Sequence, residues 1–193
     1  MNPLDLARIC AQAYKDRTWH AAGSEALLLN QQGNLVLAFR GTTSVSDWLD
    51  NFEAIPFYDS QLGFVHRGFI SGAAALFKII RAHNLDNVYL TGHSKGGAEA
   101  TLFAAKLAVQ GATIASLTTF GSPRAGFTLR KILQNIPTFR YVHGIDAIPN
   151  HPWPLWGYRH VGAKIPLRSP APNAIKDHLI SNYIKALENE PYP

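Results

Sequence analysis

The chain of 193 residues is 47% hydrophobic and carries a formal net charge of +5 at neutral pH. This length and composition support a buried core, and we expect a single domain spanning residues 1–193. The lysines and arginines are scattered, with no basic stripe interleaved with aromatic residues, which argues against a nucleic-acid partner. Cys10 is the single cysteine, so no disulfide can form within the chain.

The N-terminus shows no basic flank followed by an apolar segment, and no stretch approaches the length of a membrane span. We therefore expect a cytoplasmic location by default. Export by another route, or loss of a signal, is left open.

The predicted elements begin with a helix from about Pro3, capped by Asn2, and a hairpin with strands over residues 25–29 and 35–40. Helices and strands then alternate. In chain order they are a helix over 69–82, a strand over 87–90, a helix to about 110, a strand over 113–120, a helix near 128–135, a strand over 138–142 and a helix over 179–187. This alternation predicts an α/β fold with a mainly parallel central sheet and helices on both faces.

A Gly-His-Ser-Lys-Gly sequence joins the strand near residue 90 to the helix that follows it. This is the pattern of a nucleophile elbow, in which a serine stands on a sharp turn between a strand and a helix. Gly92 and Gly96 are needed because a Cβ at either position would collide with neighbouring backbone. We therefore predict that Ser94 is a nucleophile, in place of an ordinary glycine-rich turn.

A serine nucleophile needs a histidine base and a carboxylate that orients it, in the chain order Ser, acid, His in this kind of fold. Asp146 follows a predicted strand and precedes Ala147-Ile-Pro149, so it lies where the sheet gives way to a loop. Glu99 lies in the elbow helix itself, and Asp177 is adjacent to His178. Asp146 is therefore the predicted acid.

The residues alone leave three candidate bases after Asp146, namely His151, His160 and His178. His151 is followed by a proline that restricts its backbone, and His160 is predicted to be a strand residue. His178 stands between a proline-rich loop and the last predicted helix, and we favour it.

Motifs in a fixed order give the chain a resemblance to the fungal-type (class 3) lipase family. They are residues 37–43, Asp47-Trp48, residues 65–69, 91–97, 119–124 and 146–149, and Asp177-His178. The resemblance implies one α/β-hydrolase domain in which Ser94, Asp146 and His178 are nucleophile, acid and base. It also implies an oxyanion hole formed by the backbone N–H and hydroxyl of Thr42 with the backbone N–H of Lys95.

The oxyanion hole also has a physical basis in the residues. Lys95 begins a predicted helix, where its N–H has no partner within the helix, and Thr42 follows the flexible Gly41 at the end of a strand. Lys95 departs from the family pattern, because many relatives carry an apolar residue there. Its ammonium either attracts an anionic headgroup or points to solvent and pairs loosely with Glu99, and we favour the second.

Two segments are candidates for substrate binding. In residues 44–52, Trp48 belongs to an apolar helical face that fits either a flap over the site or a fixed core helix. In the proline-rich loop 149–158, Trp153 and Trp156 fit either an acyl-binding wall or a loop that covers the sheet.

We therefore expect a serine carboxylic-ester hydrolase, a lipase or esterase that acts on lipid-like esters through an acyl-enzyme. The alternatives are a phospholipase A1-like or acyltransferase activity on the same triad, and a catalytically silent lipid- or partner-binding protein. No cofactor is implied, and the spacing of the histidines matches no compact metal site. A lipid or other ester is the expected partner, transient contact with a lipid surface is left open, and the sequence does not indicate an oligomeric state.

Overall fold

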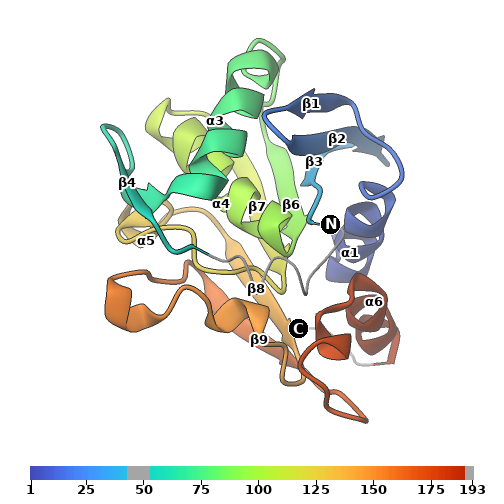
Figure 1. Ribbon diagram of the computed structural model, residues 1–193. Coiled ribbons are helices and arrows are strands. Elements are labelled where there is room, and N and C mark those ends of the chain that lie inside the picture. The colour runs from blue at the N-terminus through green and yellow to red at the C-terminus, as the bar shows by residue number, and fades with distance from the viewer. Residues whose placement is uncertain (43–52, 190–193) are drawn as a thin grey trace.

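A central sheet organises the computed structural model, which describes residues 1–42 and 53–189. Its strand order is β1-β2-β3-β6-β7-β8-β9, with β1, β2 and β3 paired antiparallel and β3 to β9 paired parallel (Figure 1). The strands are β1 (Trp19–Ala21), β2 (Ser24–Gln31), β3 (Asn34–Phe39), β6 (Val88–His93), β7 (Ile114–Phe120), β8 (Thr138–His143) and β9 (Ala163–Leu167). The predicted α/β architecture with a mainly parallel sheet is confirmed.

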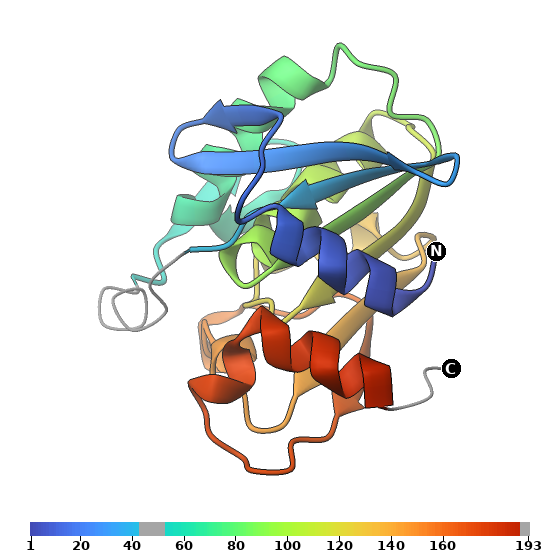
Figure 2. The same cartoon turned by 90° about the vertical axis from the view of Figure 1, so that its right-hand side faces the viewer.

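Helices cover both faces of this sheet, as the sequence predicts. The helices are α1 (Pro3–Gln12), α3 (Arg67–Ile80), α4 (Lys95–Val109), α5 (Leu129–Ile132) and α6 (Ile180–Asn189). α3 and α4 pack on one face, and α1 and α6 lie side by side on the other (Figures 1 and 2). None of the helices in the described ranges is long and apolar enough to cross a membrane.

The pleat of β3 explains how one strand contributes to two cores. Leu37 and Phe39 enter the core under α3 and α4, whereas Val36 and Ala38 enter the core under α1 and α6. All four residues are fully buried. After its first residue, Asn34, the strand is a continuous apolar run, which is typical of a strand covered on both faces.

Several boundaries differ from the sequence prediction. α3 begins and ends two residues earlier than expected, and α5 is a single turn that ends at Ile132, because the turn after it leads through Pro137 directly into β8. His160 lies outside the named strands, which corrects its assignment as a strand residue. Asn2 caps α1 as predicted, since its side chain accepts a hydrogen bond from the backbone N–H of Asp5.

Short elements complete the described chain. A separate hairpin pairs β4 (Pro56–Asp59) with β5 (Gly63–His66). Three 3₁₀ helices, η1 (Ile148–Asn150), η2 (Pro154–Trp156) and η3 (Lys176–His178), follow β8 and β9. η1 and η3 lie at the carboxyl end of the sheet, where the predicted site residues meet.

Candidate active site

Ser94 stands on the sharp turn that the sequence predicts. It joins β6 to α4 with φ 58° and ψ −131°, in a region that L-residues seldom adopt. A Cβ on Gly92 would collide with the backbone of Gly96, and a Cβ on Gly96 would collide with the carbonyl group of Phe39. The two glycines therefore allow the turn to pack against its own helix and against β3.

The structure brings Ser94, His178 and Asp146 together as predicted. The Oγ of Ser94 lies 2.8 Å from Nε2 of His178, and Nδ1 of His178 lies 2.8 Å from Oδ2 of Asp146. A carboxylate can only accept, so Nδ1–H donates to Asp146 and Nε2 is free to accept from the serine hydroxyl. All three side chains are buried.

The other hydrogen bonds of Asp146 hold its carboxylate in place. Oδ1 accepts from the backbone N–H of Ile148 at 2.9 Å, and Oδ2 accepts from the hydroxyl of Tyr183 at 2.6 Å. Burial and the neighbouring Asp146 carboxylate raise the pKa of Tyr183 well above its usual value, so its hydroxyl keeps its proton and donates. Tyr183 was not singled out by sequence reasoning.

His93 and Tyr14 form a second layer behind His178. Nε2 of His93 lies 2.7 Å from the backbone carbonyl oxygen of His178, and Nδ1 of His93 lies 2.7 Å from the Tyr14 hydroxyl. Burial and the adjacent His178 hold the pKa of His93 well below its usual value, so His93 is neutral. Its Nε2–H therefore donates to the carbonyl, and its Nδ1 accepts from Tyr14. Sequence reasoning missed both residues, although His93 lies inside the elbow motif.

Asp177 and His160, two of the other acid and base candidates of the sequence analysis, form hydrogen bonds elsewhere. The carboxylate of Asp177 accepts hydrogen bonds from the backbone N–H groups of Ile145 and Asn173 and from the Ser169 hydroxyl. The ring of His160 lies 2.8 Å from the carbonyl oxygen of Pro149. Within the described residues, no group of three His, Cys, Asp or Glu side chains could hold a metal ion.

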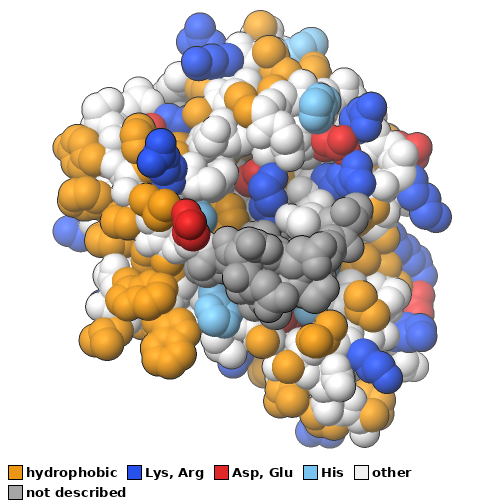
Figure 3. Space-filling model, in the orientation of Figure 1, with side chains coloured by type: hydrophobic (Ala, Val, Ile, Leu, Met, Phe, Trp, Pro, Cys, Tyr) orange, Lys and Arg blue, Asp and Glu red, His pale blue; other side chains and the backbone are white. Residues whose placement is uncertain are grey.

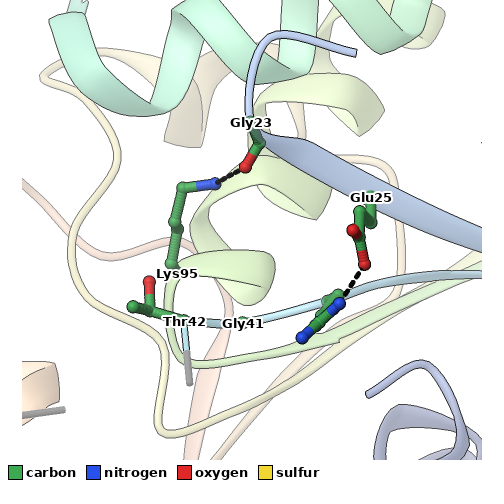
Figure 4. A pocket seen from close by; sticks show the side chains of 6 residues that line it. Gly23, Glu25, Gly41, Thr42 and Lys95 are labelled. Atoms are coloured by element: carbon green, nitrogen blue, oxygen red, sulfur yellow. Dashed lines mark hydrogen bonds and ion pairs between the residues drawn. The ribbon is translucent and has the colours of Figure 1, made fainter. Parts of the chain in front are cut away.

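Thr42 and Lys95, the predicted oxyanion pair, line one cavity of about 250 Å³ together with Gly23, Glu25, Arg40 and Gly41 (Figure 4). A Cβ built on Gly41 would lie 3.1 Å from Cβ of Ser94, so the chain just after β3 passes directly beside the serine. Lys95 is the first residue of α4, where its backbone N–H has no partner within the helix. Both predicted donors therefore belong to segments next to Ser94, and their role as an oxyanion hole stays a prediction.

The Lys95 side chain pairs with Glu99, as we favoured, but the pair is not solvated. Its Nζ lies 2.6 Å from Oε1 of Glu99 and 2.9 Å from Oγ of Ser24. The Glu99 side chain is fully buried and that of Lys95 is 21% exposed. The ammonium therefore neutralises an interior carboxylate.

Trp153, the residue before η2, and Trp156, the last residue of η2, lie at the surface with 58% and 56% of their area exposed. Such exposure is typical of a surface loop, and their role as an acyl-binding wall stays a prediction. Trp48 and the rest of residues 43–52 lie outside the described residues, so the flap also stays a prediction.

Comparison with known proteins places this geometry in a family. Residues 36–155 match the family described as Lipase (class 3). The secreted mono- and diacylglycerol lipase 1 of Fusarium solani is 35% identical over 144 residues, which are 68% of this chain and 43% of that protein. A lipase of Rhizomucor miehei is 28% identical over 164 residues, which are 76% of this chain and 45% of that protein.

Solved structures show the same fold. The lipase of Rhizopus microsporus var. chinensis superposes with a TM-score of 0.74 at 23% identity, over 89% of this chain and 75% of that one. Lipase II of Rhizopus niveus gives a TM-score of 0.71 at 24% identity, over 86% of this chain and 80% of that one. The fold is that of the α/β-hydrolases.

The comparisons also correct one expectation. The cytoplasmic location is wrong, because relatives from Fusarium solani and Penicillium cyclopium are named as secreted lipases. The chain spans less than half the length of the curated relatives described above. The family match covers well over half of this chain, from β3 through the elbow and Asp146 to η2, and the protein therefore belongs to the class 3 lipase family.

Proposed function

We propose that this protein is a serine carboxylic-ester hydrolase that acts on lipid-like esters. The observation that carries the proposal is the continuous hydrogen-bonded series from Ser94 Oγ through the His178 ring to the Asp146 carboxylate. A serine hydroxyl is a weak nucleophile at neutral pH, and a histidine within hydrogen-bond reach supplies the missing base. The family membership supports the same reading.

In the proposed reaction, Ser94 Oγ attacks the ester carbonyl carbon while Nε2 of His178 accepts the hydroxyl proton. Asp146 stabilises the resulting imidazolium, and the backbone N–H groups of Thr42 and Lys95 donate to the oxyanion. Each such donor contributes about 3 kcal/mol to transition-state stabilisation. The imidazolium then protonates the leaving alcohol, which departs and leaves an acyl group on Ser94.

Water completes the cycle in the second half of the reaction. His178 removes a proton from water, the hydroxide attacks the acyl carbonyl carbon, and the proton returns to Ser94 Oγ as the acid is released. A phospholipase A1-like activity uses the same steps on a different ester, and one relative, from Oryza sativa, is named phospholipase A1-II 1. Because several relatives are named as secreted, we also propose that the protein works outside the cell.

The test is hydrolysis of p-nitrophenyl butyrate and p-nitrophenyl palmitate by the wild type and by Ser94→Ala, with labelling by a serine-directed phosphonate. We expect Ser94→Ala to lose activity by about a thousandfold or more and to lose labelling. Ser116→Ala, a buried serine of β7, is the matched control and should keep both. Parallel assays on neutral glycerides and phospholipids separate lipase from phospholipase action. A folded wild type that neither turns over an ester nor reacts with the phosphonate would contradict the proposal and favour a binding protein.

A further inference from the structure

A second cavity, away from the serine, has an unusual charge. It lies between α5, the start of β8 and the chain that leads into β9, and has a volume of about 1160 Å³. Its lining includes Arg124, Arg130, Lys131 and Arg159, and none of the acidic residues that the structure describes lines it. We call it the cationic cleft. It shares Arg124 and Arg159 with a smaller inner cavity that is also lined by Arg140.

No described acidic residue forms an ion pair with any of these five cations. Instead, Nη1 of Arg124 donates to the carbonyl oxygens of Asn150 and Pro152, at 2.6 and 2.8 Å. Nη1 of Arg159 donates to the carbonyl oxygens of Pro154 and Tyr158, at 2.5 and 2.9 Å. These neutral acceptors fix the two guanidinium groups in position without neutralising their charge.

The charges also act on one another. Burial and the neighbouring Arg159 lower the pKa of Arg124, and burial and Arg124 lower the pKa of Arg140. The Nε of Arg140 is buried and has no hydrogen-bond partner among the described residues. A cluster of like charges with a buried, unpaired hydrogen-bond donor lowers the stability of the folded protein unless an anion binds to it. Fixed guanidinium groups match the oxygens of a phosphate, to which they can donate in pairs.

An exposed apolar loop borders the same cleft and indicates the source of that anion. Pro154 lines the cleft as the first residue of η2, and the large exposed hydrophobic residues of this loop are Trp153, Leu155 and Trp156. Leu155 is 88% exposed. Figure 3 shows large hydrophobic side chains gathered over this part of the molecule. Exposed tryptophans beside cations are typical of surfaces that meet anionic lipid headgroups.

We propose that the cationic cleft binds the phosphate of an anionic phospholipid headgroup while Trp153, Leu155 and Trp156 contact the lipid surface. The site is separate from the cavity beside Ser94, so it can hold the protein on a phospholipid surface without occupying the position of the reacting ester. Its function does not depend on the catalytic role of Ser94, and binding by a Ser94→Ala protein tests it independently.

The experiment measures binding of the Ser94→Ala chain to phosphatidylcholine vesicles with and without phosphatidylglycerol, at one ionic strength. Arg130→Gln/Lys131→Gln removes two exposed cleft charges, and Lys78→Gln/Arg81→Gln removes two exposed charges at the end of α3 as the matched control. We expect phosphatidylglycerol to strengthen binding, and the cleft variant to weaken it by about tenfold or more. The control should change binding by less than about twofold, because exposed charges elsewhere act only through the screened net field.

Equal weakening by the two double variants would show a general charge attraction and would overturn the proposal. Vesicle binding of equal strength with and without phosphatidylglycerol would overturn it as well. A titration with inorganic phosphate, monitored by NMR of the arginine Nε–H groups, distinguishes a lipid headgroup from a free anion as the ligand. Saturable phosphate binding that the cleft variant loses, without any preference for anionic vesicles, would overturn the lipid assignment and assign the cleft to a free anion. Arg140 lines the inner cavity that adjoins the cleft, so Arg140→Gln should weaken saturable binding of both probes in a folded protein.

Discussion

The Nε2 atom of His93 lies 2.7 Å from the backbone carbonyl oxygen of His178. The residue before the proposed nucleophile thus holds the segment that carries the proposed base. Because Nδ1 of His93 accepts from Tyr14, this arrangement connects the turn after α1 with β6 and η3 through two side chains and one carbonyl group. The position of the base therefore depends on a residue of the turn that follows the first helix, far away in the sequence.

Tyr14→Phe tests this second layer. The substitution leaves Nδ1 of a buried, neutral His93 without a donor, which costs about 1–3 kcal/mol of unfolding free energy. We expect that loss in urea unfolding, together with a lower kcat, since His178 is held less firmly. Tyr58→Phe is the control, because the Tyr58 side chain is 63% exposed. Unchanged stability and unchanged kcat in Tyr14→Phe would show that the hydrogen bond contributes nothing.

Gly96→Ala tests the packing of the elbow. The added Cβ would collide with the carbonyl group of Phe39 in β3, so the strand or the turn must move. We expect a loss of at least about 2 kcal/mol in unfolding free energy and loss of most activity, because overpacking a tight contact shifts backbone. Gly68→Ala in α3 is the control, since its nearest new contact is a side-chain atom of His66 at 3.3 Å. A fully stable and active Gly96→Ala protein would contradict the role assigned to this glycine.

The sequence alone was sufficient to predict the nucleophile elbow, because the strand, the two glycines and the helix that define it are contiguous. Asp146 could be chosen because Glu99 and Asp177 failed on local geometry, but His178 needed the family resemblance to separate it from two other histidines. The residues missed by sequence reasoning act across long separations. Tyr14 and His93 are 79 residues apart, and no local pattern pairs them.

The elements missed by sequence reasoning are short. β1, β4, β5 and β9 have three to five residues each, too few for an alternating pattern to stand out. β9 also contains Pro166, which is tolerated because β9 is the edge strand of the sheet. Pairing of Lys95 with Glu99 followed from their spacing of four residues. The burial of that pair did not, because it depends on Ser24 and on the close approach of α3 at Gly72.

Lys95→Met tests the buried ion pair. Without Lys95, the interior carboxylate of Glu99 has no counter-charge, and breaking a buried pair in this way costs about 3–5 kcal/mol. Burial already raises the pKa of Glu99, with Lys95 opposing it. The charged form is therefore the unfavourable one, and the variant should lose stability as the pH rises above the usual glutamate range near 4.3.

The double variant Lys95→Met/Glu99→Gln is the control, because it removes both charges together. We expect it to regain most of the lost stability and to show little dependence on pH in urea unfolding. Ester hydrolysis should persist in the double variant, since the proposed oxyanion donor at residue 95 is its backbone N–H. A single variant as stable as the wild type at pH 8 would show that the pair does not neutralise an interior charge.

Asp177→Asn tests a carboxylate that ties the segment carrying Asp146 to the one carrying His178. Burial opposes ionisation of Asp177, but its hydrogen bonds from Ile145, Ser169 and Asn173 prevail and lower its pKa. The pKa of Asp177 is lower in the folded protein than in the unfolded chain, where it is about 3.9. The stabilisation is therefore present at pH values above the unfolded-state pKa, and it is lost as the pH falls through the folded-state pKa. Hydrogen bonds to a charged group contribute about 1.5–3 kcal/mol each, so we expect a clear difference between the two proteins at pH 7.

That difference should shrink steadily as the pH falls below about 4, because the wild-type carboxylate then protonates and resembles the amide. Urea unfolding at a series of pH values measures it directly. Asp86→Asn, at an exposed position, should follow the wild type at every pH. If the Asp177→Asn curve stayed parallel to that of the wild type down to pH 2, the stabilisation would come from packing of the side chain, and its charge would not be what joins the two segments.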